Sequence, residues 1–144
     1  MRSADHLIKH ISSNPLIARP LDEEGDPDPA RRPQALVTYI ESLRKTRELP
    51  AEIVLSGHGE PITDHVALID ERFALHERRA NKLAGLIEEQ PHSAYEIAQS
   101  LWGNVAVTQA YLTLCEVLGH VDLLLDDGEV VEVERDGVVH FAAA

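Results

Sequence analysis

The chain is organised around the stretch Ile53-Val54-Leu55-Ser56-Gly57-His58-Gly59-Glu60-Pro61-Ile62. A short apolar run bounded by turn residues is typical of a buried strand, and the Gly-His-Gly that follows predicts a tight loop at the carboxyl end of that strand. Ligands bind at the carboxyl ends of strands in open α/β sheets. Because flanking glycines let the backbone turn sharply, His58 is a candidate metal ligand there, and an exposed turn residue is the alternative interpretation.

Composition describes an ordinary globular chain. With 144 residues, 44% hydrophobic and 26% charged, it has the length of one domain or of two very small ones. No run approaches the length of a membrane span, and the N-terminus lacks the apolar core of a signal peptide, so we expect a cytoplasmic protein. The single cysteine, Cys115, lies among apolar residues and is expected to be buried without a disulfide within the chain.

Two helices are predicted on either side of the central stretch. The acidic, proline-broken segment Asp22–Pro29 predicts a surface loop before the first helix. That helix begins at Pro33, ends before Leu49-Pro50, and has apolar residues at helical spacing: Leu36, Tyr39, Ile40 and Leu43. Thr63-Asp64 can cap a second, longer helix that contains Val66, Ile69, Phe73, Leu83, Leu86 and Ile87. Its polar middle, His76–Arg79, predicts a solvated face with local ion pairs, with a substrate contact as the alternative.

The last third follows a winged-helix pattern. Ser93, with Glu96 as its capping-box partner, predicts a short helix over residues 94–102, and Gly103-Asn104 turns into a second helix from about 105 to 118 or slightly further. Asp136-Gly137 then predicts a β-hairpin that joins residues 129–133 to 138–141. Trp102, Tyr111 and Leu112 are interpreted as core residues of this unit. We therefore expect two domains, 1–62 and 63–144, with the long helix as the connector.

Charge argues against a nucleic-acid role for this winged helix. The formal net charge is −12, and residues 83–134 contain ten carboxylates and no Lys or Arg. A duplex binder needs cations to neutralise phosphates, whereas the second helix offers only Thr108, Gln109, Tyr111 and Thr113. We expect this unit to pack against a catalytic body or a protein partner, and nucleic acid is the less favoured partner.

The order of these segments carries a family resemblance. An Asp5-His6-Leu7-Ile8 start, the Ile11–Ile17 run, the Leu55–Ile62 loop and the winged-helix pattern together resemble the C-terminal half of metallo-β-lactamase-fold hydrolases, in the branch with a C-terminal winged-helix tail. The resemblance implies an α/β (α+β) fold: the C-terminal part of an αββα sandwich followed by a small winged-helix domain. Ala4 stands where the family usually has glycine, and Ser56 where it often has proline.

The resemblance also implies a metal site and a chemistry. In such families Asp5 would bridge two metal ions, of the zinc type, and His58 would bind one of them. The complete enzyme would hydrolyse an ester, thioester, amide or phosphodiester, and the sequence does not name the substrate. The family's principal motif, His-x-His-x-Asp-His, is absent from this chain, and we interpret the i, i+4 pair His6 and His10 as incidental.

Two ligands cannot make a hydrolytic zinc site, which ordinarily needs at least three protein ligands and an open position. We therefore expect the chain to be a fragment, a truncated form or one half of a split protein. Alone, it should bind metal weakly or not at all and have little or no hydrolytic activity. Such a piece should expose an unpaired strand edge and associate with itself or with a complementary N-terminal chain. The competing hypothesis is a non-catalytic winged-helix interaction module.

Overall fold

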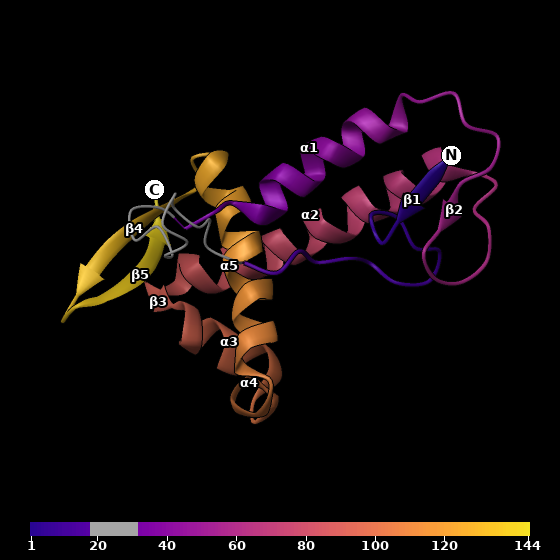
Figure 1. Ribbon diagram of the computed structural model, residues 1–144. Helices are drawn as coiled ribbons and strands as arrows, with labels where there is room; N and C mark the ends of the chain where they lie inside the picture. Colours follow the sequence, from indigo (N-terminus) through magenta and orange to yellow (C-terminus); the bar gives the residue numbers. More distant parts are fainter. Residues whose placement is uncertain (18–31) are drawn as a thin grey trace, which may run out of the picture.

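The computed structural model describes residues 1–17 and 32–144, which form five helices and two small sheets (Figure 1). The predicted surface loop Asp22–Pro29 lies outside the described residues. The helices are α1 (Ala35–Arg47), α2 (His65–Glu89), α3 (Ala94–Trp102), α4 (Val105–Thr108) and α5 (Ala110–Asp126). The strands are β1 (Arg2–Ala4), β2 (Leu55–Ser56), β3 (His92–Ser93), β4 (Val130–Arg135) and β5 (Val138–Ala143). The predicted mixed α/β class is confirmed.

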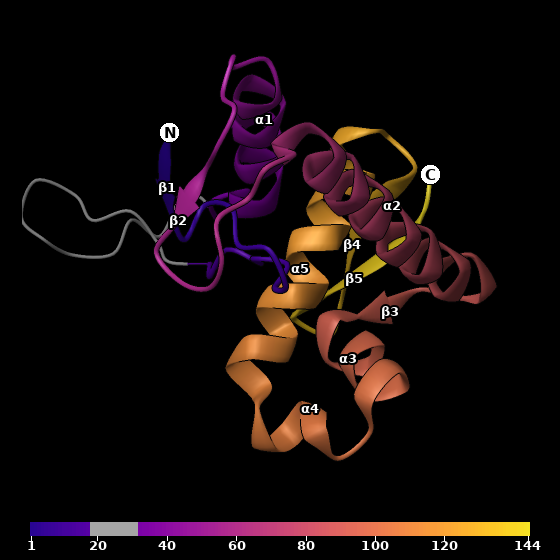
Figure 2. The same cartoon turned by 90° about the vertical axis from the view of Figure 1, so that its right-hand side faces the viewer.

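The first sheet pairs β1 with β2 in parallel, so that segments more than 50 residues apart lie side by side (Figure 2). Burial in the central stretch is narrower than predicted. Val54 is fully buried, but its neighbours Ile53 and Leu55 are 50% and 47% exposed. Successive side chains of an extended segment point to opposite faces, and this small sheet is covered on one face only. The expectation of a continuously buried strand was therefore wrong on either side of Val54.

Two hydrophobic clusters share the long helix α2. The first joins the N-terminal segment, α1 and the beginning of α2, and consists of Leu7, Leu36, Ile40, Leu43, Val54, Ile62, Leu68 and Ile69. The second joins the later part of α2 to α3, α4, α5 and the hairpin, and consists of Ala80, Leu83, Ile87, Ile97, Ala98, Ala106, Val117, Val121, Leu124, Val130 and Phe141. The change from one cluster to the other occurs within α2, between Ile69 and Ala80. A division at residues 62–64 stays a prediction.

Local signals placed the starts of α2 and α3 correctly, whereas α1 begins at Ala35, two residues after the predicted Pro33. The Asp64 side chain accepts a hydrogen bond from the backbone N–H of Ala67 at 2.9 Å and caps α2. Ser93 and Glu96 form the predicted capping box, and α3 has the predicted bounds. These caps satisfy backbone N–H groups that have no partner within the helix.

The predicted second helix of the C-terminal unit is broken and longer than expected. It divides at Gln109 (φ −124°, ψ 38°) into α4 and α5, and α5 continues to Asp126. The extension is explained by Val121 and Leu124, which continue the buried face of α5 into the second cluster. Tyr111 and Leu112 were wrongly assigned to the core, because they are 57% and 52% exposed, whereas Cys115 is buried as predicted.

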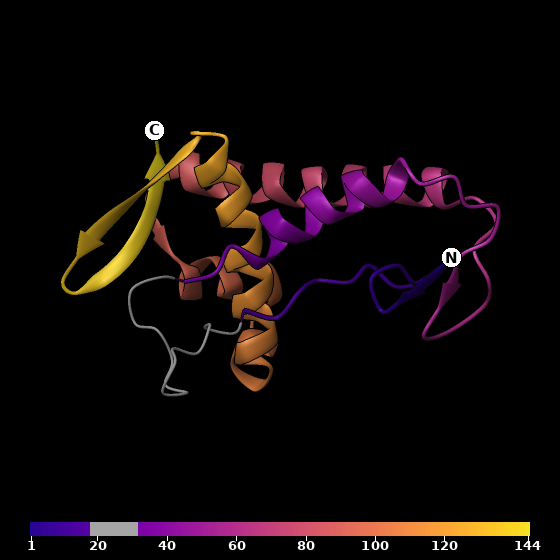
Figure 3. The ribbon, with the colours of Figure 1, turned by 45° about the horizontal axis from the view of Figure 1, so that its top comes forward.

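The C-terminal hairpin has the predicted turn. Asp136 (φ 51°) and Gly137 (φ 76°) both have positive φ, which a two-residue type I′ connection requires. The short strand β3, which was not predicted, pairs with β5 on the other side, giving the order β3-β5-β4. Figure 3 shows this hairpin at the opposite end of the molecule from β1 and β2. The elements follow the order expected of a winged helix, and that assignment stays a prediction. No helix within residues 1–17 and 32–144 is both long and apolar enough to cross a membrane.

Candidate metal centre

The parallel pairing of β1 and β2 determines where the two predicted metal ligands lie. Asp5 follows β1 directly, and His58 follows β2 after one glycine. Because parallel strands end at the same edge of a sheet, their following loops meet there. The backbone N–H of Gly57 donates to the carbonyl of Ala4 at 2.8 Å, which fixes the two loops side by side.

The side chains of Asp5 and His58 meet at this edge. His58 Nε2 lies 3.4 Å from Asp5 Oδ1, and the two side chains are 73% and 70% exposed. Nitrogen and oxygen ligands each about 2.1 Å from a tetrahedrally coordinated zinc ion would be about 3.4 Å apart. A Cβ at Gly57 would stand only 2.8 Å from Asp5 Oδ1, so the approach depends on the glycine. The separation of these two donor atoms therefore equals the one expected for two ligands of a single zinc ion.

The two departures from the family pattern have local consequences. Ala4 has φ +45°, in the left-handed region, where a Cβ is disfavoured. This explains why a glycine is the natural occupant of a position that here carries alanine. Ser56 lies at the position where the family often has proline, and its hydroxyl donates to the carbonyl of His58 at 2.6 Å. A side-chain hydrogen bond from Ser56 thus restrains the loop that carries His58, where a proline would restrain it through its ring.

Several contacts hold the Asp5 loop in place. The Ser13 hydroxyl donates to the carbonyl of Asp5 at 2.9 Å. Lys9 Nζ bonds Glu60 Oε2 at 2.7 Å and ties this segment to the loop after β2. Tyr39 of α1 donates its hydroxyl to the carbonyl of His6 at 2.8 Å. These contacts fix the backbone around Asp5 while leaving its carboxylate free to face solvent.

The histidines near Asp5 do not extend the site. His6 Nε2 is 3.0 Å from Thr46 Oγ1 of α1, and burial lowers the pKa of His6 below its usual value. His6 and His10 do not lie on a helix, so their i, i+4 spacing does not bring them onto one face. Across residues 1–17 and 32–144, no group of three or more His, Cys, Asp or Glu side chains is placed to hold a metal ion.

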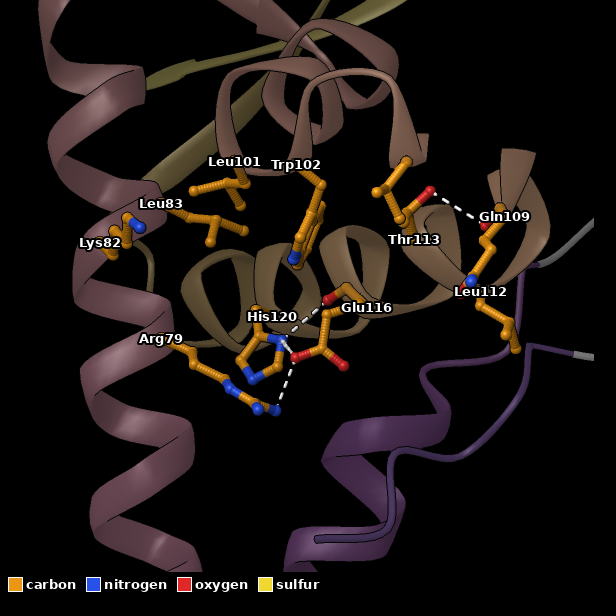
Figure 4. Close-up of a pocket in the computed structure, with 11 residues that line it drawn as sticks. Arg79, Lys82, Leu83, Leu101, Trp102, Gln109, Leu112, Thr113, Glu116 and His120 are labelled. Atoms are coloured by element: carbon orange, nitrogen blue, oxygen red, sulfur yellow. Dashed lines mark hydrogen bonds and ion pairs between the residues drawn. The ribbon is translucent and has the colours of Figure 1, made fainter. Parts of the chain in front are cut away.

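A buried polar network at the middle of α2 was missed by sequence reasoning. The predicted solvated face was wrong for His76, which is 1% exposed, and its Nδ1 lies 3.1 Å from Nε2 of His120 on α5. Arg79 also forms an ion pair between helices, at 2.7 Å from Glu116 of α5, instead of a local one (Figure 4). The reason is tertiary, because α5 packs across α2 at this level and covers part of its polar face.

The hydrogen bonds of this network define the protonation of both rings. His120 Nδ1 lies 2.7 Å from the backbone carbonyl of Glu116 and must donate to it, because a carbonyl can only accept. In a neutral His120 ring, Nε2 is therefore the acceptor. His76 Nδ1 then donates to that nitrogen, and His76 Nε2 is left to accept from the Ser12 hydroxyl at 3.4 Å. Burial, followed by the charges of His120, Arg79 and Arg72, lowers the pKa of His76 to about 4. Burial is also the main cause that lowers the pKa of His120.

The run Ser12-Ser13-Asn14 connects this network to the candidate metal centre. Ser12 contacts His76, Ser13 bonds the Asp5 backbone, and Asn14 Nδ2 donates to a carboxylate oxygen of Glu116. This run belongs to the Ile11–Ile17 segment that supports the family resemblance. The sequence marks the segment by its polar residues before a proline, but its partners on α2 and α5 depend on how those helices pack.

Comparisons with known proteins show what this chain is similar to. No family model matches the chain. It is 34% identical over 141 residues to "Probable metallo-hydrolase YqjP" of Bacillus subtilis (strain 168), a match that covers 98% of this chain and 42% of the relative. A crystal structure of a beta-lactamase domain protein from Burkholderia ambifaria has a TM-score of 0.73 and 27% identity, covering 99% of this chain and 39% of that one. The metallo-beta-lactamase family protein TTHA1429 from Thermus thermophilus has a TM-score of 0.64 and 23% identity, covering 86% and 40% respectively.

These matches confirm the resemblance that the sequence indicated. The chain is similar in sequence to a probable metallo-hydrolase and in fold to two metallo-β-lactamase-type proteins, and it spans less than half the length of each of them. A metallo-hydrolase requires a metal cofactor, and the roles of Asp5 and His58 as its ligands stay a prediction.

Proposed function

We propose that Asp5 and His58 are ligands of a two-metal, zinc-type hydrolytic site, with Asp5 bridging the ions and His58 binding one of them. The observation that supports this most directly is the 3.4 Å separation of Asp5 Oδ1 and His58 Nε2 at the shared edge of β1 and β2. Similarity to a protein described as a probable metallo-hydrolase supports it independently. The remaining ligands would come from outside the described residues.

The chemistry proposed is hydrolysis of an ester, thioester, amide or phosphodiester. Bound ions would polarise the scissile group and lower the pKa of water at the site. The residues of this chain hold and orient the site: Asp5 and His58 present their donor atoms, Ser13 fixes the backbone of Asp5, and the Lys9–Glu60 pair keeps the two loops together. With two donors only, we expect the isolated chain to bind metal weakly and to hydrolyse little.

We further propose that the sheet of β1 and β2 is completed by another polypeptide segment, either a second copy or a complementary chain with the His-x-His-x-Asp-His motif. Exposed apolar side chains gather at this sheet, because Met1, Ile53 and Leu55 are 39%, 50% and 47% exposed. Strands with unpaired edges and apolar faces are ready templates for pairing. Sedimentation of the chain with and without such a polypeptide tests this association.

The metal site itself is tested by titrating the purified chain with Zn²⁺ and with Co²⁺, using calorimetry and cobalt absorption. We expect weak binding that Asp5→Asn and His58→Ala each abolish, and that His10→Ala, on the same surface, leaves unchanged. Thermal unfolding of each variant checks that the fold is kept. Binding that survives both substitutions would overturn the assignment. Tight stoichiometric zinc that depends on neither residue would show that the site lies elsewhere.

A further inference from the structure

A pocket of about 510 Å³ opens between α2, α3, α4 and α5 (Figure 4). No residue of the candidate metal centre lines it. Its volume is in the range of small-molecule sites, about 300–1,000 Å³. β1 and β2 lie away from the crossing of α2 and α5 where this pocket opens, so the pocket is separate from the candidate metal centre.

The walls of the pocket are largely apolar. Four of the helices contribute to them, with Leu83 from α2, Leu101 and Trp102 from α3, Val105 from α4 and Leu112 from α5. Figure 4 shows Trp102 extending from α3 toward α5, between Leu101 and Thr113. A drug-sized apolar group would therefore find aliphatic and aromatic surface on several sides.

The polar side of the pocket has an excess of positive charge. Glu116 is already satisfied, since Arg79 bonds one carboxylate oxygen and Asn14 the other. Arg79 and Glu116 thus cancel, and His120 is neutral in its hydrogen-bonded form. Lys82 lines the same pocket and forms no ion pair with any residue in the described part of the chain. Lys82 therefore leaves one uncompensated positive charge at the pocket.

This charge is unusual in the surrounding chain. The protein has a formal net charge of −12, and residues 83–134, which build three of the four helices around the pocket, contain no Lys or Arg. The negative net charge of the protein repels anions over most of its surface. The Lys82 ammonium beside the apolar cavity is therefore a local site where an anionic group can bind. A cationic amphiphile would meet Arg79 and Lys82 at the same opening.

We propose that this pocket binds a small amphipathic carboxylate: an apolar chain or ring of drug size that carries one negative charge. The apolar part lies against Leu83, Leu101 and Trp102, and the carboxylate bonds the Lys82 ammonium. Trp102 Nε1, a donor with no partner in the described residues, can supply a further hydrogen bond. A charge-assisted bond of this kind fixes the orientation of an otherwise apolar ligand.

The chain contains its own reporter for this binding. Trp102 is the one tryptophan of the sequence, so the intrinsic fluorescence of the protein reports on the pocket directly. We would titrate the full chain with decanoate, below its micelle concentration, and follow the tryptophan emission. Decyltrimethylammonium, which has the same chain and the opposite charge, is the matched probe. We expect a saturable change with decanoate and a much weaker one with the cation.

Variants separate the charge from the apolar wall. Lys82→Gln should weaken decanoate binding about tenfold, as expected for the loss of one charged hydrogen bond. Lys45→Gln, an exposed lysine on α1, is the control and should have no effect. Leu112→Glu places a negative charge at the rim from a half-exposed position, and it should abolish binding while thermal unfolding shows an intact fold.

Three results would overturn the proposal. They are equal binding of decanoate and decyltrimethylammonium, an unchanged affinity in Lys82→Gln, and a tryptophan emission that does not respond to decanoate. Asp5→Asn should leave decanoate binding unchanged. The decanoate titration therefore tests the pocket independently of the proposed metal site.

Discussion

Lowering the pH from 7.5 to 5 should destabilise this protein mainly through His76. Its ring is buried and satisfied only as a neutral donor and acceptor between Ser12 and His120. A proton added to His76 would sit on the nitrogen that accepts from Ser12. The groups that face the ring from the packed elements are Tyr39, Arg72, Arg79 and His120, and none of them is a carboxylate that could stabilise the imidazolium.

The magnitude follows from the difference between the folded and unfolded pKa values. In the folded chain the pKa of His76 is lowered from 6.5 to about 4. Because the folded value is the lower one, the unfolded state binds the proton first, and stability is lost as the pH falls from about 6.5 toward 4. At roughly 1.4 kcal/mol per pKa unit, the loss is about 2 kcal/mol at pH 5 and about 3 kcal/mol below pH 4. That is a large part of the roughly 5–15 kcal/mol that stabilises a typical domain.

Urea unfolding at pH 7.5 and pH 5 measures this loss. His76→Gln removes the titrating ring, so the stability difference between the two pH values should shrink by about 2 kcal/mol relative to the unmodified chain. If His76→Gln retains the full pH dependence, then the buried ring is not the group that senses the proton, and the reasoning from its neutral hydrogen bonds is wrong.

Two further predictions concern the backbone near the candidate site and the start of α2. Ala4→Gly should stabilise the chain by about 0.5–1 kcal/mol and raise Tm by roughly 2–4 °C, because glycine adopts a φ of +45° without the steric strain of a Cβ. Ala74→Gly within α2 is the control and should lower Tm. A fall in Tm for both would show that Ala4 is not strained. Asp64→Ala should cost about 1 kcal/mol in urea unfolding, because it removes the cap on Ala67, and Thr63→Ala should cost little.

The sequence by itself determined the local structure of this chain. Helix starts at Asp64 and Ser93 and the hairpin turn at Asp136-Gly137 were all predicted, because each depends on residues within a few positions of one another. The pairing of Asp5 with His58 was expected from the family resemblance, and the parallel strands β1 and β2 bring the two side chains together. Their role as metal ligands stays a proposal.

Tertiary packing alone decided the rest. Whether His76 faces water or another helix depends on where α5 crosses α2, and the two histidines that meet there are 44 residues apart. The same crossing decides that α5 extends to Asp126, and that Lys82 stands beside a pocket instead of on an open face. The periodicity of the sequence predicts which face of a helix is apolar. The partner of a polar residue on that helix depends instead on which distant helices pack against it, and that packing is set by the sum of many contacts along the chain.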